Sequence, residues 1–287
     1  MKNWLDESKE ENKGKIFIKM IDIRLSDNLD LMAEIKDNTV DLIYCDILYG
    51  TGRKFADYQD LKPKREIIEE HYIPRIKEMH RILKDTGSIY LQMDTKINHW
   101  LRCILDDVFG YDNFKSEIVW FYNSQGKTNK EWNKKHDNIL YYTKSNKWTF
   151  NYKDVKDSIT DLTYKRFKKE IDLKGYYTSF KNGKEYKYYL EDGSLPKDWF
   201  EDITYISRSN KELNGYNTQK PKSLIERLVK ASSNRGDLVA DFYAGSFTTA
   251  EVCKDLNRNF IGCDISEKAV EIGYARLGGK KQNSKHP

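Results

Sequence analysis

The sequence has no long apolar run. Its hydrophobic stretches fall short of the about 18 to 20 residues that a membrane-spanning helix requires, and the N-terminal stretch MKNWLDESKEENKGK lacks the apolar segment of a signal peptide. Cysteine and histidine are also scarce: the 4 cysteines form no C-x-x-C pair, and the 5 histidines show no ligand spacing. We therefore expect a cytoplasmic protein with no membrane segment, no disulfide and no structural metal.

The chain is long enough for a sizeable core and is rich in charged residues. Its 287 residues suffice for one large core, or for one core with a small second lobe, and 38% hydrophobic with 33% charged residues is typical of a soluble protein. The net charge of +5 permits a polyanionic partner without requiring one. The position of the charges is therefore more informative than their sum.

Residues 15–143 alternate between strand and helix patterns. Strands are expected at 15–20, 40–45 and 88–93, and residues 117–122 and 138–143 are predicted to form a pair of strands that flank a polar loop. Two apolar stripes at helical spacing are also present: Tyr72, Ile76, Met79 and Leu83, then Trp100, Leu101, Ile104, Leu105 and Val108. This alternation predicts an α/β fold with a mainly parallel sheet covered by helices.

Residues 144–213 have a different character, with no strand and helix alternation. Basic and aromatic residues are interleaved here: Lys165, Arg166, Lys168, Lys169, Lys174, Lys181, Lys184 and Lys187 with Tyr164, Phe167, Tyr176, Tyr177, Phe180, Tyr186, Tyr188 and Tyr189. Two interpretations remain open. Either the segment is a solvated lobe whose aromatics form a core of their own, or it is a nucleic-acid surface with cations on phosphates and aromatics against bases.

Alternation resumes after residue 215. A helix is predicted to open at Pro221, and Ser266 is predicted to cap a final helix that reaches Leu277. Between them a strand runs into the turn Ala244-Gly245-Ser246, and a second strand ends in Asp264, 19 residues beyond Gly245. A tight turn followed at this distance by a carboxylate is the pattern of a Rossmann-like nucleoside pocket. The stretch AGSFTT lacks G-x-G-x-x-G, which disfavours NAD.

Asp46 follows the apolar run 40–45 and lies where that strand leaves the sheet. Either it caps a turn, or it holds a substrate at the edge where open α/β sheets bind ligands. The C-terminal segment supplies about two strands, too few for a stable sheet, so these strands must complete the sheet that begins near residue 40. We therefore expect one catalytic domain of residues 1–143 and 214–287, interrupted by an insertion at 144–213.

Four motifs in order carry a family resemblance: DILY at Asp46, TQKP at Thr218, DFYAGSFTTA at Asp241 and IGCDIS before the last helix. Together they resemble the β-class DNA amino-methyltransferases of the N-4/N-6 DNA methylase family. The resemblance covers most of the chain outside 144–213. It implies a circularly permuted Rossmann-like methyltransferase fold, S-adenosylmethionine as cofactor, and an inserted target-recognition region that contacts double-stranded DNA.

The resemblance also implies residue roles. It makes Asp46, Ile47, Leu48 and Tyr49 the catalytic tetrapeptide, in which an Asp in first place goes with N6 of adenine and a Ser with N4 of cytosine. The target base must be flipped out of the duplex; Asp46 and the carbonyl of Ile47 then accept the amine N–H groups, and Tyr49 stacks on the ring. It makes the cofactor loop Asp241, Phe242, Ala244, Gly245 and Ser246, the ribose acid Asp264, and the residues at the methionine end Thr218, Gln219 and Lys220.

Asp27 has two interpretations: with Asn28 it either caps the following helix or helps to hold the amino acid end of the cofactor. The tetrapeptide and the cofactor loop both depart from the family pattern, because Ile47 and Leu48 replace two prolines and Phe247 replaces a glycine. An active adenine-N6 methyltransferase, an inactive DNA-binding partner subunit and a cytosine-N4 methyltransferase therefore remain as alternatives. A homodimer, a heterodimer and a cognate restriction endonuclease are left open by the sequence.

Overall fold

A computed structural model of the chain describes residues 20–54, 59–122, 128–206, 212 and 219–279, and the backbone of 11–12 and 15–16. The chain divides into a larger unit of residues 1–150 and 198–287 and a smaller unit of residues 151–197. Within the described ranges, no helix combines the length and the apolar character that crossing a membrane requires.

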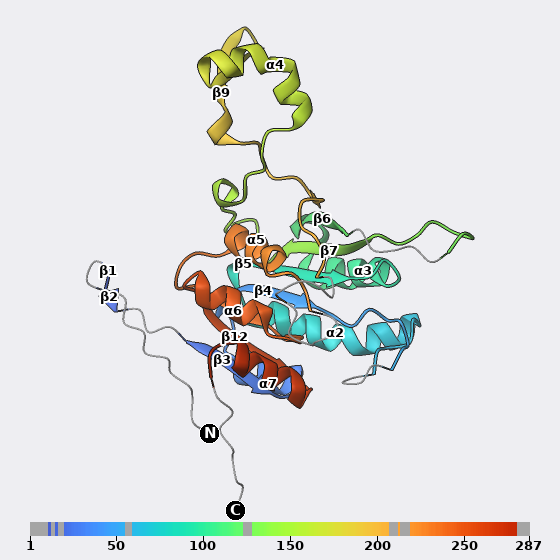
Figure 1. Ribbon diagram of the computed structural model, residues 1–287. Helices are drawn as coiled ribbons and strands as arrows, with labels where there is room; N and C mark the ends of the chain where they lie inside the picture. The colour runs from blue at the N-terminus through green and yellow to red at the C-terminus, as the bar shows by residue number, and fades with distance from the viewer. Residues whose placement is uncertain are drawn as a thin grey trace, which may run out of the picture. The chain divides into compact units, whose positions relative to one another are not determined.

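The larger unit is built on an eight-stranded sheet with the order β10-β6-β7-β5-β4-β11-β12-β3 (Figure 1). In this sheet only β7 runs antiparallel to its neighbours. The mainly parallel sheet and the β6–β7 pair are thus as predicted. The strands are β3 (Ile21–Leu25), β4 (Val40–Asp46), β5 (Leu83–Met93), β6 (Phe114–Phe121), β7 (His136–Thr143), β10 (Trp199–Phe200), β11 (Leu238–Asp241) and β12 (Asn259–Asp264).

Helices cover both faces of this sheet. Successive side chains of β4 point to opposite faces, so they pack into two separate apolar cores. In one core, Ile43 and Cys45 pack with residues of α1 (Asn28–Glu34), α2 (Arg65–Ile82) and α3 (Asn98–Phe109). In the other core, Leu42 and Tyr44 pack with residues of α5 (Lys222–Ser232), α6 (Thr248–Asp255) and α7 (Glu267–Arg276). The result is a three-layer α/β/α unit.

Most predicted elements are confirmed, and Ser266 caps α7 through the backbone N–H of Ala269. The strand predicted at 15–20 does not supply the first strand of the main sheet. Residues 15–16 (β2) pair with β1 (Glu11–Asn12), and residues 17–19 lie outside the described residues. The sheet strand is β3, whose sequence IDIRL buries only Ile23, while Asp22 and Arg24 form an ion pair at 2.7 Å. An edge strand with one buried side chain gives a weak apolar signal, which the neighbouring KIFIKM exceeds.

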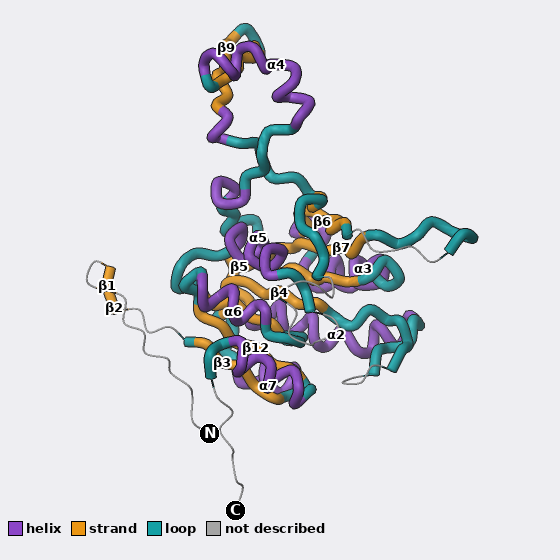
Figure 2. Tube along the Cα trace, viewed as in Figure 1, coloured by secondary structure: helices purple, strands orange, loops and turns teal. Residues whose placement is uncertain are grey.

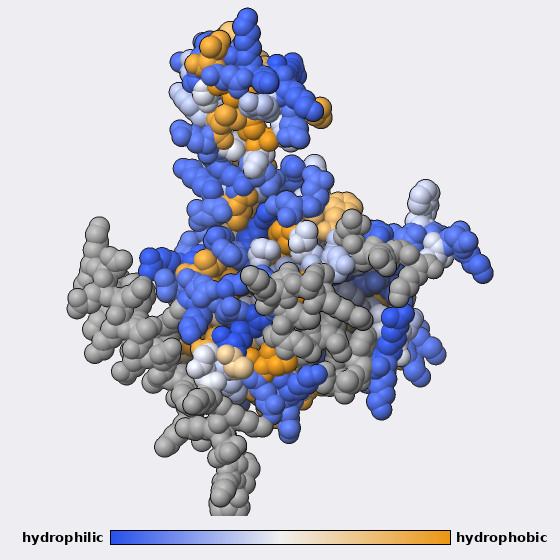
Figure 3. All heavy atoms as spheres, viewed as in Figure 1, coloured by the Kyte–Doolittle hydropathy of each residue, from blue (hydrophilic) through white to orange (hydrophobic). Residues whose placement is uncertain are grey.

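The smaller unit consists of α4 (Asp161–Lys174) and the antiparallel hairpin β8 (Tyr176–Lys181) and β9 (Lys184–Tyr189) (Figure 2). Its aromatics contact one another: Phe167 stacks on Tyr177 with ring centroids 4.3 Å apart, and Tyr177 on Tyr188 at 5.1 Å. Figure 3 shows mainly hydrophilic residues over its surface, with hydrophobic residues between them. These aromatics contact one another but are half-buried or exposed, so both interpretations of this segment stay open.

The boundaries of this unit are narrower than the predicted 144–213. Residues 144–150 group with the larger unit, and Trp199 and Phe200 form β10 at the edge of the main sheet. A two-residue strand is too short to show an alternating pattern, so the sequence does not mark it. The role of residues 151–197 in target recognition stays a prediction.

Candidate functional site

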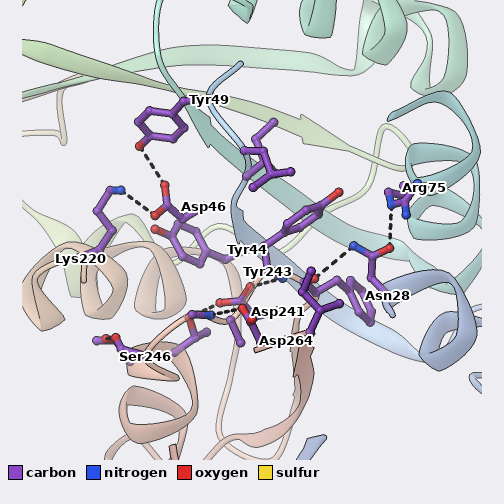
Figure 4. Close-up of a pocket in the computed structure, with 18 of the residues that line it drawn as sticks. Asn28, Tyr44, Asp46, Tyr49, Arg75, Lys220, Asp241, Tyr243, Ser246 and Asp264 are labelled. Carbon is purple, nitrogen blue, oxygen red and sulfur yellow. Dashed lines mark hydrogen bonds and ion pairs between the residues drawn. The ribbon is translucent and has the colours of Figure 1, made fainter. Parts of the chain in front are cut away.

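Three neighbouring parallel strands each end in an acid. β4 ends in Asp46, β11 in Asp241 and β12 in Asp264, and these strands are adjacent in the sheet. The carboxyl edge of such a sheet is where ligands bind. A pocket of about 210 Å³ lies at this edge, and all three acids line it (Figure 4).

This pocket collects nearly all of the predicted site residues. Gln219 is not among the residues that line it, since its side-chain amide donates to the carbonyl of Glu212 at 2.8 Å. Thr218 lies outside the described residues. The predicted residues that line the pocket are Asp27, Asp46, Ile47, Leu48, Tyr49, Lys220, Asp241, Phe242, Ala244, Gly245, Ser246 and Asp264.

The carboxylate of Asp264 is held by backbone groups on both sides. Its Oδ2 accepts from the N–H of Gly245 at 2.9 Å, and its Oδ1 accepts from the N–H of Ser266 at 2.9 Å. Gly245 has φ +49°, a left-handed conformation that glycine adopts at little cost. Each carboxylate oxygen can accept a further bond, so the side chain is oriented and still able to bind a pair of hydroxyls.

Asp241 is buried beneath the same loop. Its Oδ2 accepts from the Thr249 hydroxyl at 2.6 Å, and its Oδ1 accepts from the N–H of Tyr243 at 3.1 Å. Burial raises the pKa of Asp241 to about 7, and these two hydrogen bonds only partly oppose the shift. Burial therefore favours the protonated form of Asp241, and a cation bound in the pocket would favour its charged form.

Phe247 follows this loop with a left-handed backbone, φ +55°, although it is not glycine. Its side chain is fully buried in the core beside α6 and α7. Gly273 of α7 makes room for it, because a Cβ at position 273 would lie 2.6 Å from the Phe247 ring. The loop thus keeps the backbone conformation that suits a glycine, and the buried ring compensates for the strain.

Asp46 is engaged on both oxygens (Figure 4). Its Oδ2 accepts from the Lys220 ammonium at 2.6 Å, and its Oδ1 accepts from the Tyr49 hydroxyl at 2.8 Å. Burial raises the pKa of Asp46, and the Lys220 charge is the main influence that opposes the shift. Lys220 was predicted to border the methionine end of a cofactor; its ammonium contacts the first acid of the tetrapeptide.

Hydrogen bonds fix the backbone on either side of Ile47 and Leu48. The N–H of Ile47 donates to the carbonyl of Gln92 at 3.1 Å, and the Tyr72 hydroxyl donates to the carbonyl of Leu48 at 2.9 Å. The buried carboxylate of Asp60 also accepts from the N–H groups of Gly50 and Thr51, which directly follow the tetrapeptide, at 3.1 and 2.7 Å. These bonds hold the tetrapeptide without the two prolines of the family pattern.

The DNA methylase family model matches residues 40–275, which include both of these loops and all three acids. This chain belongs to the DNA methylase family. Members of the family use S-adenosylmethionine as the methyl donor, and the order of the motifs in the chain is as the resemblance implied.

Relatives of this methylase carry names from the same family. M.HpaI, a type II methyltransferase of Haemophilus parainfluenzae, is 32% identical over 88% of this chain and 72% of its own length. The DNA adenine methyltransferase YhdJ of Escherichia coli K12 is 31% identical over 86% of this chain and 80% of its own. The crystal structure of the M1.HpyAVI–SAM complex, 20% identical, aligns over 90% of this chain and all of its own with a TM-score of 0.55. The fold of the methylase is therefore that of known DNA methyltransferases.

The sequence did not single out Asp137, a buried acid near the start of β7. The Tyr49 hydroxyl lies 2.7 Å from its Oδ2, so the methylase holds a second carboxylate beside the tetrapeptide. An acid placed directly before the apolar run NILYYT was the available signal.

A second group of missed residues lies at the α1 and α2 side of the pocket. Arg75 donates to Asn28 Oδ1 at 2.7 Å and pairs with Asp27 at 3.3 Å, and His71 Nε2 lies 3.0 Å from the Tyr243 hydroxyl. Burial, with Arg75 nearby, lowers the pKa of His71 to about 4, so this histidine is neutral at pH 7. Asp27 caps α1 through the N–H of Leu29. It also lines the pocket, so its two interpretations are compatible.

Proposed function

We propose that this methylase transfers a methyl group from S-adenosylmethionine to N6 of an adenine that has been flipped out of double-stranded DNA. The observation that carries the proposal is the position of Asp46 in one pocket with the cofactor loop and Asp264. The 31% identity to a DNA adenine methyltransferase supports adenine as the target. An Asp at the first position of the tetrapeptide supports the same choice.

The pocket residues suit the cofactor. Asp264 is oriented to accept hydrogen bonds from ribose hydroxyls, and Gly245 and Ser246 let the backbone approach a ligand closely. Asp46 and Asp241 provide negative charge for a cationic group. When bound, S-adenosylmethionine supplies an electrophilic methyl group on a positively charged sulfur.

The tetrapeptide would prepare the target amine. An exocyclic amine on adenine is a weak nucleophile because its lone pair is delocalised into the ring. Asp46 and the carbonyl of Ile47 each accept one N–H, which localises the lone pair, and Tyr49 provides a face for the ring. Lys220, 2.6 Å from Asp46, opposes the rise in the pKa of Asp46 that burial causes and so favours the charged carboxylate.

An inactive DNA-binding subunit is a second candidate, because Asp46 already has a partner on each oxygen in this structure. Under the first proposal the target amine replaces the Tyr49 hydroxyl at Oδ1. Under the second, the pair with Lys220 and the bond to Tyr49 are permanent features of a silent partner chain. Product analysis separates these candidates and also tests cytosine-N4 methylation.

The experiment expresses wild type and Asp46→Ala in a host without DNA methylation and measures modified nucleosides by mass spectrometry. We expect N6-methyladenine from the wild type, and a rate at least about 100-fold lower from Asp46→Ala, as for loss of a preorganised polar contact. Asp112→Ala, which changes an exposed acid outside the pocket, is the matched control. N4-methylcytosine, or no product from a wild type that binds cofactor and DNA, would contradict the proposal.

We also propose that residues 151–197 read the DNA sequence and that a cognate restriction endonuclease recognises the same site. The type II names of relatives such as M.HpaI support the second point, and the exposed basic side chains of α4 support the first. Replacing Lys165, Arg166, Lys168 and Lys169 with Ala should weaken duplex binding and flatten its salt dependence while cofactor affinity stays unchanged. An unchanged salt slope would return these residues to a purely structural role.

A further inference from the structure

Asp137 is a buried carboxylate that the proposed reaction does not use. It is 4% exposed and comes from β7, next to β5 in the sheet. Its Oδ2 accepts from the amide of Gln92 at 3.0 Å, and its Oδ1 accepts from the Tyr122 hydroxyl at 3.1 Å. Gln92 is itself fixed by the Tyr44 hydroxyl at 2.8 Å. The position of Asp137 is therefore set by its own neighbours and does not depend on Tyr49.

The Tyr49 hydroxyl has two acceptors and one proton. Its oxygen lies 2.8 Å from Asp46 Oδ1 and 2.7 Å from Asp137 Oδ2. A phenol can donate to only one of them at a time. Rotation of the hydroxyl hydrogen about the C–O bond is enough to change the acceptor, with no movement of the ring and no covalent bond made or broken.

We propose that Asp137 is a positioning residue that receives the Tyr49 hydrogen bond when Asp46 takes up the target amine. This inference rests on the proposed function, in which Asp46 Oδ1 accepts an N–H of the flipped base. The Tyr49 hydroxyl then turns to Asp137 and keeps one hydrogen bond throughout. Asp46 is freed without leaving a buried hydroxyl unpaired, and the Tyr49 ring keeps its place beside the base.

Lys220 makes the exchange electrostatically reasonable. Its ammonium lies 2.6 Å from Asp46 Oδ2 and 4.0 Å from Asp137 Oδ2, so a single cation is near both carboxylates. It also lies 5.0 Å from the centroid of the Tyr49 ring. Asp46 can therefore remain charged while it exchanges one donor on Oδ1 for another, because its bond to Lys220 on the other oxygen is not disturbed.

The test is a double-mutant cycle on turnover. Asp137→Ala in the wild type should lower kcat about 10- to 100-fold, as for loss of a buried hydrogen-bond partner. In the Tyr49→Phe background, which has no hydroxyl to hand over, the same change should lower kcat less than about 3-fold, within the error of additivity. The affinity for S-adenosylmethionine, measured by calorimetry, should be the same in all four proteins.

Two further variants keep the test decisive. Asp137→Leu, which is close to Asp in volume and has no hydrogen-bond acceptor, serves in the same cycle if Asp137→Ala does not fold. Tyr122→Phe removes another hydroxyl from Asp137 and leaves Tyr49 intact, so it is the control for a general disturbance of the network and should change kcat little. Two results would show that Asp137 has only a structural role, and would overturn this inference alone. The first is an equal loss of kcat on substitution of Asp137 in the wild-type and Tyr49→Phe backgrounds. The second is a loss of kcat in Tyr122→Phe as large as that in Asp137→Ala. A wild type that makes no N6-methyladenine would overturn the proposed function, and this inference with it.

Discussion

Two parts of the site depart from the family pattern: Phe247, which follows the cofactor loop, and the tetrapeptide at Asp46–Tyr49. The molecule compensates for these two departures in different ways. At Phe247 the compensation is packing: a left-handed residue buries its ring in the core against Gly273. At Ile47 and Leu48 it is hydrogen bonding: the Ile47 N–H donates to the carbonyl of Gln92, and the Tyr72 hydroxyl donates to the carbonyl of Leu48.

This difference means that restoring the family residue need not restore the family's stability or rate. A glycine at 247 would remove a buried ring, and a proline at 47 would remove a hydrogen-bond donor. Charge changes should disturb the tetrapeptide, whose contacts are polar, and volume changes should disturb Phe247, whose side-chain contacts are apolar. Each prediction below tests one side of this contrast.

The largest expected effect is that of Lys220→Met, which keeps the length of the side chain and removes its charge. An ionised Asp46 accepts an N–H more strongly than a protonated one, so activity should fall as the pH falls through the pKa of Asp46. Burial raises that pKa and Lys220 opposes the shift, so the variant should lose activity at a higher pH than the wild type. We expect turnover at pH 7 to fall at least about 10-fold, because Asp46 binds a proton more readily once the Lys220 charge is removed.

A pH–rate profile measures this shift. Lys230→Met is the matched control, since it removes the charge of a lysine that pairs with Glu226 at 2.6 Å on α5, outside the pocket. The prediction fails if Lys220→Met lowers turnover equally at every pH. Such a result would mean that Lys220 acts on the cofactor or the DNA and not on the ionisation of Asp46.

Phe247→Gly should have the next largest effect, and on stability. Loss of a buried aromatic side chain costs about 3 to 5 kcal/mol, and relief of the left-handed backbone offsets about 1 to 2 kcal/mol of this. The free energy of unfolding should therefore fall by about 1 to 4 kcal/mol, as measured by denaturant titration.

Gly273→Ala sharpens this test, because its Cβ would lie 2.6 Å from the Phe247 ring. Alone it should destabilise the protein by overpacking, about 1 to 3 kcal/mol. Combined with Phe247→Gly it should cost less, since the ring is gone. Additive losses would show that the two residues do not compensate for each other.

Much of the fold could be predicted because its signals are local. The helical stripe of α2 and the cap of α7 at Ser266 depend on residues within a few turns of each other. β3 and β10 escaped prediction because an edge strand with one buried residue, or a strand of two residues, has little pattern of its own. Their place is decided by pairing with β12 and β6, which are distant in sequence.

In the candidate site, too, some residues could be predicted from the local sequence and others could not. Asp46, Gly245 and Asp264 follow apolar strands, so strand order alone brings them to one edge. The pairing of Lys220 with Asp46 and of Asp137 with Tyr49 joins positions 174 and 88 residues apart. Nothing in the local sequence reports such contacts, since they arise only when the chain has folded.

Asp264→Ala should weaken cofactor binding by about 1 to 3 kcal/mol, the cost of removing a partly buried acid that accepts hydrogen bonds. Titration calorimetry with S-adenosylmethionine or S-adenosylhomocysteine measures it. Glu267→Ala, three residues later at the start of α7, is the control and should bind as the wild type does. Preference of the wild type for NAD would contradict the assignment of this pocket.

The smallest expected effect separates the two positions of the missing prolines. Ile47→Pro removes the N–H that donates to the carbonyl of Gln92, so it should destabilise the protein by about 1 kcal/mol and lower turnover modestly. Leu48→Pro keeps the carbonyl that accepts from Tyr72, and it should preserve turnover or raise it where the backbone already has a suitable φ. Denaturant titration and initial rates of both single variants measure the difference. A higher rate in Ile47→Pro than in Leu48→Pro would mean that loop rigidity matters more here than the bond to β5, and the contrast between a packed cofactor loop and a hydrogen-bonded tetrapeptide would no longer hold.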